Sequence, residues 1–170
     1  MMKKLFLACM MALCAVSANA QFEAGKAYVN ASTSGLGLSY SKNDKLRLNV
    51  GLTAGLFVAD DWMVYAVAEY DHKQLMYRNF KGSKFYQDEV QLGLGGRYYI
   101  EQNGIYLGMG LQYGHTEQSF DNFYVTPEVG YAFFINQYLT IEPALYYHMS
   151  VNDFSGGSTV GLKLGLGFYF

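Results

Sequence analysis

The chain has 170 residues, enough for one domain, of which 51% are hydrophobic and 17% aromatic. Its formal net charge of −2 excludes the strongly basic balance that draws proteins to nucleic acid. After residue 20, no uninterrupted apolar run approaches the length of a membrane-spanning helix. If the chain crosses a membrane, it must therefore do so with strands.

Residues 1–20 predict a signal peptide. The segment starts with positive charge, residues 5–16 form an apolar run of the right length, and residues 17–20 supply the small side chains of a cleavage site. We expect cleavage after Ala20, which removes two lysines and leaves 10 basic against 14 acidic residues, a mature formal charge of −4. Residues 21–170 then form the mature domain.

Cysteine occurs only at Cys9 and Cys14, both inside the predicted signal peptide. Cys14 follows Leu13 rather than a small residue, which argues against a lipoprotein cleavage site. The mature chain is therefore expected to contain no disulfide and no thiolate metal site although it is exported. No cofactor and no metal site are predicted.

Alternation of apolar with other residues recurs along the mature chain, and this period of two is the period of a β-strand. The first segment, residues 27–40, is the least clear, because only Leu36, Leu38 and Tyr40 mark an apolar face and the phase of the strand stays open. Seven further segments follow in chain order, at residues 46–58, 62–71, 89–100, 105–114, 123–135, 139–148 and 160–170. In the last one, glycine and lysine fill most of the positions between the apolar residues.

The connections between these segments alternate in length. The tight ones are residues 59–60, 101–104 and 136–137. The longer and more polar ones are residues 71–85, 116–122 and 150–157, with the short 41–45 on the same side. Short turns at one end and longer loops at the other are typical of transmembrane β-barrels. Aromatic residues gather beside the short turns, as in a girdle at one membrane interface: Trp62, Tyr98, Phe133, Tyr138 and Phe168.

Eight strands, each long enough to cross a bilayer at a tilt, predict an all-β fold, an eight-stranded antiparallel up-and-down transmembrane β-barrel. Closing the sheet leaves no unpaired edge in the hydrocarbon, and the apolar face meets lipid. The other face points into a lumen that side chains fill, where glycines leave room for larger neighbours. A soluble lipocalin-like barrel is disfavoured, because its apolar residues would point inward.

Charged residues fall on the predicted lumen face of most strands. They are Arg47, Glu69, Glu89, Arg97, Glu128, Glu142 and Lys163. Counting from the short turns places Lys163 about level with Glu69 and Glu128, and Arg97 about level with Glu142. Because enclosed ions need partners, we expect a salt-bridge network that plugs the barrel. The alternative is a charged path for protons or ions, which would make the protein a narrow pore.

His148 and Ser150 stand two residues apart and so share one face of their strand. They resemble the His-x-Ser pair of outer-membrane lipid A deacylases, in which the histidine activates the serine as nucleophile. The sequence departs from that family in two ways. Only Asp153 follows as a carboxylate that could orient His148, and the alternation places the pair on the lumen face rather than toward lipid. A lipid A-modifying hydrolase is therefore an alternative, and a non-enzymatic protein is favoured.

The predicted loop 71–85 is basic and aromatic. Its basic residues are Lys73, Arg78, Lys81 and Lys84, and Tyr77 and Phe80 lie among them. Such a loop suits the phosphates of lipopolysaccharide or an external partner, and equally it suits an ordinary solvated loop. His72 and His115 stand alone in the sequence and are expected to be loop residues rather than metal ligands.

Essentially all of residues 21–170 resembles the family of small outer-membrane β-barrels of the OmpX and OmpA type. The C-terminal strand, with Phe168 and Phe170, looks like the signal that the outer-membrane assembly machinery reads. The stretches "TPEVGYAFF" and "IEPALYY" look like the penultimate hairpin of porin-like members of this family. Gln21 directly after Ala20 resembles the processing habit of Bacteroidota.

This resemblance implies a location in the outer membrane of a Gram-negative bacterium. The implied partners are outer-membrane lipid, lipopolysaccharide and the assembly machinery, and a monomer is expected. Because the same fold hosts anchors, adhesins and lipid-modifying enzymes, it does not decide the function. The favoured hypothesis is a structural or surface-binding protein that acts through its extracellular loops.

Overall fold

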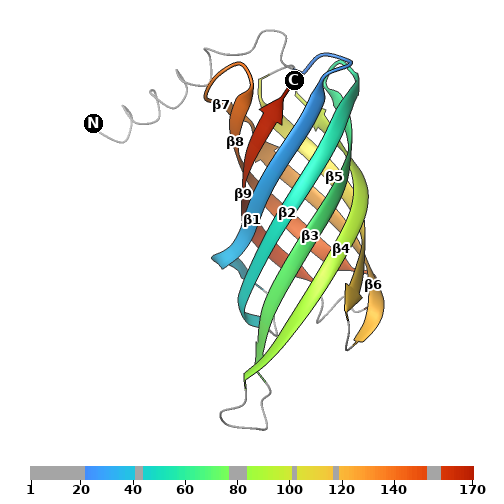
Figure 1. Ribbon diagram of the computed structural model, residues 1–170, viewed down its shortest axis with the longest axis vertical. Helices are drawn as coiled ribbons and strands as arrows, with labels where there is room; N and C mark the ends of the chain where they lie inside the picture. Colours follow the sequence, from blue (N-terminus) through green and yellow to red (C-terminus); the bar gives the residue numbers. More distant parts are fainter. Residues whose placement is uncertain (1–21, 41–43, 77–83, 101–102, 117–118, 153–157) are drawn as a thin grey trace, which may run out of the picture.

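The computed structural model describes residues 22–40, 44–76, 84–100, 103–116, 119–152 and 158–170 (Figure 1). At the strand ends 35–40, 44–47, 73–76, 84–87, 116 and 119–121 it describes the backbone alone. Within these residues the chain forms one antiparallel sheet that closes into a barrel. No helix in the described part of the chain is long and apolar enough to cross a membrane.

The strands follow one another around the barrel in chain order. They are β1 (Ala27–Tyr40), β2 (Asp44–Ala59), β3 (Trp62–Met76), β4 (Lys84–Tyr99), β5 (Ile105–Thr116), β6 (Ser119–Tyr131), β7 (Phe133–Phe134), β8 (Leu139–Ser150) and β9 (Thr159–Tyr169). β7 continues β6 after a break of one residue, so the two together count as one of the eight barrel strands, here called staves. β1 pairs with β9, and β6 and β7 pair with β8, which closes the sheet. The predicted eight-stranded antiparallel barrel is confirmed.

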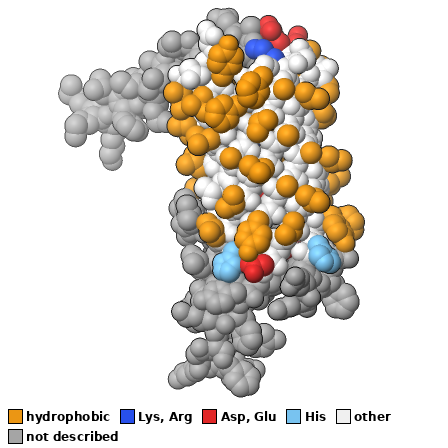
Figure 2. All heavy atoms as spheres, viewed as in Figure 1, with side chains coloured by type: hydrophobic (Ala, Val, Ile, Leu, Met, Phe, Trp, Pro, Cys, Tyr) orange, Lys and Arg blue, Asp and Glu red, His pale blue; other side chains and the backbone are white. Residues whose placement is uncertain are grey.

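Side chains alternate between the two surfaces of the barrel as the sequence predicts. On β4, for example, Leu94 points outward and is 69% exposed, whereas Arg97 and Tyr99 point inward and are buried. Figure 2 shows hydrophobic side chains over the middle of the face in view, with charged and histidine side chains toward its two ends. In water such a surface would cost about 25 cal/mol per Å² of apolar area, so hydrocarbon is its favourable surrounding.

Outward-facing aromatic rings gather at the end where the β2–β3, β4–β5 and β7–β8 connections lie, here called the turn end. The rings of Trp62 and Tyr98 on neighbouring strands have centroids 4.9 Å apart, and those of Tyr131 and Phe133 have centroids 4.2 Å apart. Tyr138 is exposed beside them. This belt has the composition of the aromatic girdles found at membrane interfaces.

Inward-facing glycines leave the room that larger side chains of neighbouring strands occupy. A Cβ atom added at Gly130 would collide with the ring of Tyr106. One added at Gly167 would collide with the carboxylate of Glu142. The many glycines opposite the apolar face are therefore explained by close packing in a narrow lumen.

The strands reach further than predicted at the opposite end, here called the loop end. β3 continues to Met76 and β4 begins at Lys84, while β5 and β6 are joined through residues 117–118 alone. The predicted loops 71–85 and 116–122 are therefore mostly strand, and that part of the prediction is wrong. Polar sequence was mistaken for loop, although ladder hydrogen bonds between antiparallel strands do not require apolar side chains.

β1 resolves the phase that the sequence left open. Tyr28, Asn30, Ser32 and Ser34 are buried and point into the barrel. The register between β1 and β9 then shifts between Ser34 and Ser39. Leu36, Leu38 and Tyr40, which marked an apolar face in the sequence, lie within or beyond this shift. The face to which they point therefore does not tell which residues point inward earlier in β1.

The stave made of β6 and β7 is the least regular. The sequence predicts one strand over 123–135, but β6 ends at Tyr131 and the ladder breaks at Ala132. The N–H of Ala132 instead donates to the carbonyl of Gly104 in the β4–β5 connection, at 2.8 Å. Pairing with β8 is also interrupted at Pro127, which has no N–H to donate.

Candidate functional site in the barrel interior

Aromatic rings fill the turn end of the interior and are here called the aromatic layer. The layer consists of Phe22, Phe57, Tyr99, Phe134 and Tyr169. Phe22 precedes β1, and its ring lies against the other four, with centroids 4.0 Å from Tyr99 and 5.6 to 5.9 Å from the rest. The hydroxyl groups of Tyr99 and Tyr169 are 3.1 Å apart, so the layer presents polar atoms to its neighbours inside the lumen.

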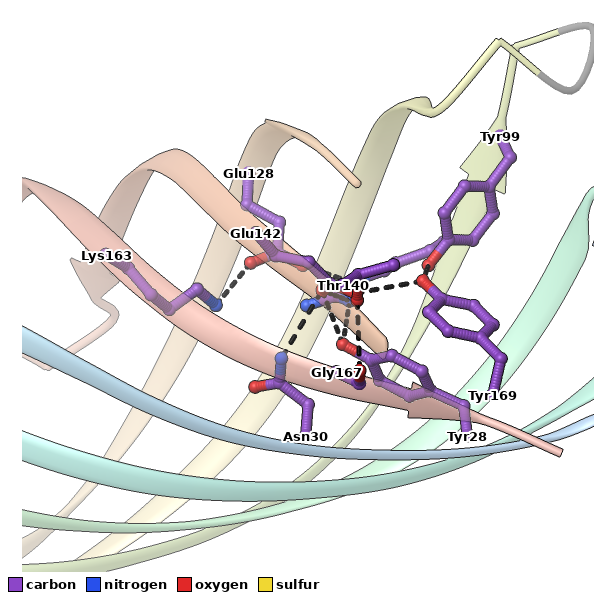
Figure 3. A network of polar contacts seen from close by, with 10 residues as sticks. Tyr28, Asn30, Tyr99, Glu128, Thr140, Glu142, Lys163, Gly167 and Tyr169 are labelled. Carbon is purple, nitrogen blue, oxygen red and sulfur yellow. Dashed lines mark hydrogen bonds and ion pairs between the residues drawn. The ribbon is translucent and has the colours of Figure 1, made fainter. Parts of the chain in front are cut away.

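An ionic cluster lies next to the aromatic layer and contains Arg97 of β4, Glu128 of β6, Glu142 of β8 and Lys163 of β9. Arg97 Nε donates to Glu128 Oε1 at 2.7 Å, and Arg97 Nη1 donates to Glu142 Oε2 at 3.2 Å. Lys163 Nζ donates to the second oxygen of Glu128. Two cations balance two carboxylates, and the contacts join four staves across the lumen. Figure 3 shows Lys163, Glu128 and Glu142 of this cluster.

Hydroxyl groups satisfy the carboxylate of Glu142. It accepts hydrogen bonds from Tyr28 at 2.6 Å, Thr140 at 2.7 Å and Tyr169 at 2.9 Å. Hydrogen bonds to an ionised acceptor are among the strongest in proteins, which is why an enclosed carboxylate can be tolerated here. Because Tyr169 belongs to the aromatic layer, this network connects the two parts of the interior (Figure 3).

The guanidinium group of Arg97 is enclosed by tyrosine rings. Its central carbon lies 4.4 Å from the ring centroid of Tyr106 and 5.4 Å from those of Tyr28 and Tyr65. Arg97 Nη1 also donates to the hydroxyl of Tyr28 at 2.8 Å. Ring faces attract the cation while the carboxylates neutralise it, so Arg97 is fixed from several strands at once.

A small polar cavity borders the ionic cluster on the side of the loop end. It measures about 10 Å³ and is lined by Ser34, Asn49, Glu69, Thr126, Tyr146, His148 and Lys163. This volume suits about one water molecule. The side chain of Lys163 is 16% exposed and that of Glu128 is 2% exposed. Lys163 is therefore the better hydrated member of this ion pair.

The sequence counts placed Lys163 level with Glu69 and Glu128, and Arg97 level with Glu142. The contacts of Lys163 with Glu128 and of Arg97 with Glu142 are present, whereas Glu69 lines the polar cavity together with Lys163. Glu128 also binds Arg97, a contact that counting along strands missed. The stagger between neighbouring strands of a tilted barrel shifts levels by more than a residue, which explains this difference.

The other charged residues predicted for the lumen lie closer to the loop end. Glu69 accepts a hydrogen bond from Asn49 Nδ2 at 3.2 Å, and Glu89 accepts one from the hydroxyl of Tyr124 at 2.8 Å. Arg47 lies in β2, paired through its backbone with a residue of β3, and its side chain is outside the described part. The ionic cluster thus contains four of the seven predicted charges.

His148 and Ser150 both point into the barrel. They are 3% and 1% exposed, and the oxygen of Thr126 lies 2.8 Å from His148 Nδ1. The imidazole also stacks on Tyr124, with ring centroids 4.1 Å apart. A lipid-modifying enzyme must present its nucleophile to lipid, and neither side chain reaches the outer surface. Asp153, the one carboxylate that follows them closely, lies outside the described residues.

The basic residues assigned to a loop are distributed differently. Lys73 lies in β3 and Lys84 in β4, so the loop assignment is wrong for these two, whereas Arg78 and Lys81 are outside the described residues. His72 and His115 were also expected in loops and instead lie in β3 and β5.

His72 Nδ1 lies 2.6 Å from Asp88 Oδ1, and both side chains are substantially exposed near the loop end. The described residues contain no group of three or more His, Cys, Asp or Glu side chains arranged to hold a metal ion.

The aromatic layer was not recognised from the sequence. Phe57, Tyr99 and Tyr169 fall on the predicted lumen face, but their convergence at one level depends on the strand stagger. Phe22 lies before the first strand and carries no periodic signal. Phe168 and Phe170, by contrast, point outward as predicted, and the N–H of Phe170 donates to the carbonyl of Ala27 at 2.9 Å.

No protein-family model and no curated protein sequence matches the chain. Among solved structures, the outer membrane protein OprG from Pseudomonas aeruginosa is similar with a TM-score of 0.61 and 16% identity, over 89% of this chain and 99% of OprG. Neisserial surface protein A is similar with a TM-score of 0.56 and 13% identity, over 85% of this chain and 96% of that one.

The attachment invasion locus protein Ail of Yersinia pestis, in complex with the heparin analogue sucrose octasulfate, is also similar. It has a TM-score of 0.52 and 13% identity, over 86% of this chain and 99% of Ail. At these identities the comparisons show a shared fold and not a shared activity.

Proposed function

We propose that this chain, which has the fold of the small eight-stranded outer-membrane β-barrels, is a non-enzymatic structural or surface-binding protein whose lumen does not conduct. The proposed location is the outer membrane of a Gram-negative bacterium, with the turn end toward the periplasm, because such barrels have short periplasmic turns. An outward surface of large apolar side chains, bordered by an aromatic belt at the turn end, supports insertion into a bilayer.

The ionic cluster is the main observation that supports a lumen through which ions do not pass. Arg97, Glu128, Glu142 and Lys163 come from four staves and meet inside the barrel. An eight-stranded barrel has a lumen only wide enough for side chains to fill, so a cluster of this size leaves little room for a path. The aromatic layer beside it narrows the interior further.

The β3–β4 hairpin supports a surface-binding role. Lys73 and Lys84 lie on its two strands, and residues 77–83, with Arg78 and Lys81, connect them. Four basic residues within positions 73–84 of the sequence attract phosphate or sulfate groups, of the kind that lipopolysaccharide carries. The fold neighbour Ail was solved with a sulfated sugar, which makes polyanions a reasonable class to test here.

Single-channel recording in planar lipid bilayers tests the proposal. The refolded protein should insert, as shown by its heat-modifiable migration on gels, and produce no current steps. Regular steps at constant voltage would contradict the non-conducting lumen. They would favour the alternative of a narrow pore, for which the polar cavity beside Lys163 is the specific supporting observation.

A further inference from the structure

The segment before β1 crosses the turn end of the barrel and is fastened there by its backbone. The carbonyl of Phe22 accepts a hydrogen bond from the N–H of Asp61 at 2.8 Å, in the β2–β3 turn. The N–H of Gly25 donates to the carbonyl of Phe57 at 2.8 Å, and the N–H of Phe57 donates to the carbonyl of Lys26 at 2.9 Å. Three hydrogen bonds thus fix the direction in which residue 22 enters the barrel.

The β2–β3 turn is shaped to receive this segment. Asp61 has a positive φ of 64°, an uncommon conformation for a residue other than glycine, and its N–H points to Phe22. The neighbouring Asp60 accepts a hydrogen bond from the N–H of Ala24 through Oδ1 at 2.9 Å. The turn therefore serves as a clamp for residues 22–26 as well as a link between two strands.

The side chain of Phe22 occupies an aromatic socket. The ring is 1% exposed and lies within 6 Å of four other rings, those of Phe57, Tyr99, Phe134 and Tyr169. Phe22 belongs to no strand, so no ladder hydrogen bond of the barrel depends on its ring. Its ring can therefore leave the socket without disturbing the pairing of the strands.

Two barriers of different chemistry follow each other along the lumen. The aromatic layer excludes water because its surface is apolar, whereas the ionic cluster fills space with paired charges. Tyr169 connects them, since its ring packs on Phe22 and its hydroxyl donates to Glu142. Neither barrier shares its main side chains with the other, so each can be removed separately.

We propose that Phe22 is a stopper that closes the turn end of the lumen independently of the ionic cluster. Residues 22–26 and the ionic cluster then form two seals in series. Unseating Phe22 admits water and small solutes from the turn end as far as Arg97 and no further. This inference goes beyond a non-conducting barrel, because it names the side chain that closes one end and predicts what remains closed without it.

A cysteine placed between the two seals tests this arrangement. Met63 is buried, points inward from β3, and pairs with Phe57 on one side and Arg97 on the other. Met63→Cys therefore reports on the space between the aromatic layer and the ionic cluster. The predicted mature chain has no other cysteine, so a charged, membrane-impermeant methanethiosulfonate reagent would label this position alone.

Labelling is compared in Met63→Cys alone, with Phe22→Ala, and with the control Phe123→Ala, which removes an outward ring from β6. Opening of the socket should raise the labelling rate about tenfold or more with Phe22→Ala and leave it unchanged with Phe123→Ala. Phe22→Leu keeps a smaller apolar side chain in the socket and should give an intermediate labelling rate. If Phe22→Ala does not fold, the test is the labelling rate with Phe22→Leu compared with that of Met63→Cys alone. Equal rates for all of these proteins would overturn the proposal.

Current recording separates this inference from the proposed function. Phe22→Ala should remain without current steps, because the ionic cluster still closes the lumen. Steps with Phe22→Ala but not with the wild type would overturn the series arrangement while leaving the wild-type barrel non-conducting. Current steps with the wild type would overturn the proposed function. If the Met63→Cys variant with Phe22 intact were also labelled rapidly, the stopper would be overturned as well.

Discussion

Replacement of Arg97 by methionine removes a buried charge while keeping an unbranched side chain of similar reach. Glu142 then loses its only cation within the ionic cluster, and Glu128 keeps Lys163. Removing one partner from a buried ion pair costs about 3–5 kcal/mol, because the remaining charge stays enclosed. We expect a loss in this range for Arg97→Met, since the three hydroxyl donors to Glu142 lower the cost only in part.

Lys163→Met should cost less than Arg97→Met. Glu128 keeps its hydrogen bond to Arg97, and Lys163 is partly exposed to the polar cavity. One charge-assisted hydrogen bond is lost, so we expect about 1–2 kcal/mol. The measurement is reversible urea unfolding in lipid vesicles, with stabilities compared at equal denaturant slopes.

A second substitution supplies the control. Glu142→Gln in the Arg97→Met background leaves Lys163 paired with Glu128 and restores the charge balance, so the double variant should recover about 1 kcal/mol or more. Glu23→Gln removes an exposed carboxylate and should change stability by about 0.5 kcal/mol or less. Losses below about 0.5 kcal/mol for both Arg97→Met and Lys163→Met would refute the reasoning, because they would mean that water screens the cluster.

Three further predictions concern other parts of the molecule. His148→Ala and Ser150→Ala should leave the lipid A mass spectrum of expressing cells the same as with the wild type, and loss of an acyl chain with the wild type alone would establish the hydrolase. Gly130→Ala should destabilise the barrel by about 1–3 kcal/mol because its Cβ meets the Tyr106 ring, whereas Gly96→Ala should be tolerated. Hydrogen bonds from His72 and then Tyr70 lower the pKa of Asp88 below its ordinary 3.8, so its contribution to stability is present above that pH and is lost as the pH falls through the lowered value. With Asp88→Asn, the free energy of unfolding should therefore fall slightly less steeply as the pH is lowered, and the effect is small because the group is exposed. A steeper fall than in the wild type would contradict this expectation.

The sequence predicted the barrel because each residue type has one favourable side of the sheet. Leu94 and Arg97 stand an odd number of positions apart on β4, so their side chains point to opposite faces of the strand. Only an outward leucine and an inward arginine suit a barrel in lipid. The same alternation of side chains along β8 predicted that His148 points into the barrel, which the structure confirms. Contacts between distant strands were harder to predict, since the double role of Glu128 depends on a stagger that no single strand encodes.

Strand ends and the aromatic stopper could not be predicted for other physical reasons. Beyond the apolar band, polar residues such as those before Met76 continue the ladder without a distinguishing pattern, so composition suggested a loop. Phe22 is held by backbone hydrogen bonds to Asp61 and by rings from several strands. Nothing in the few residues before β1 indicates that socket, because it exists only in the closed barrel.

The central claim is that the outward face of this barrel meets lipid, and the single tryptophan of the chain tests it most directly. Trp62 points outward at the turn end and is 56% exposed in the isolated chain. In vesicles its fluorescence should be blue-shifted, strongly quenched by lipids brominated near the headgroups and weakly quenched by acrylamide. Emission of a water-exposed indole, quenched by acrylamide and unaffected by brominated lipid, would contradict insertion of the barrel in the bilayer.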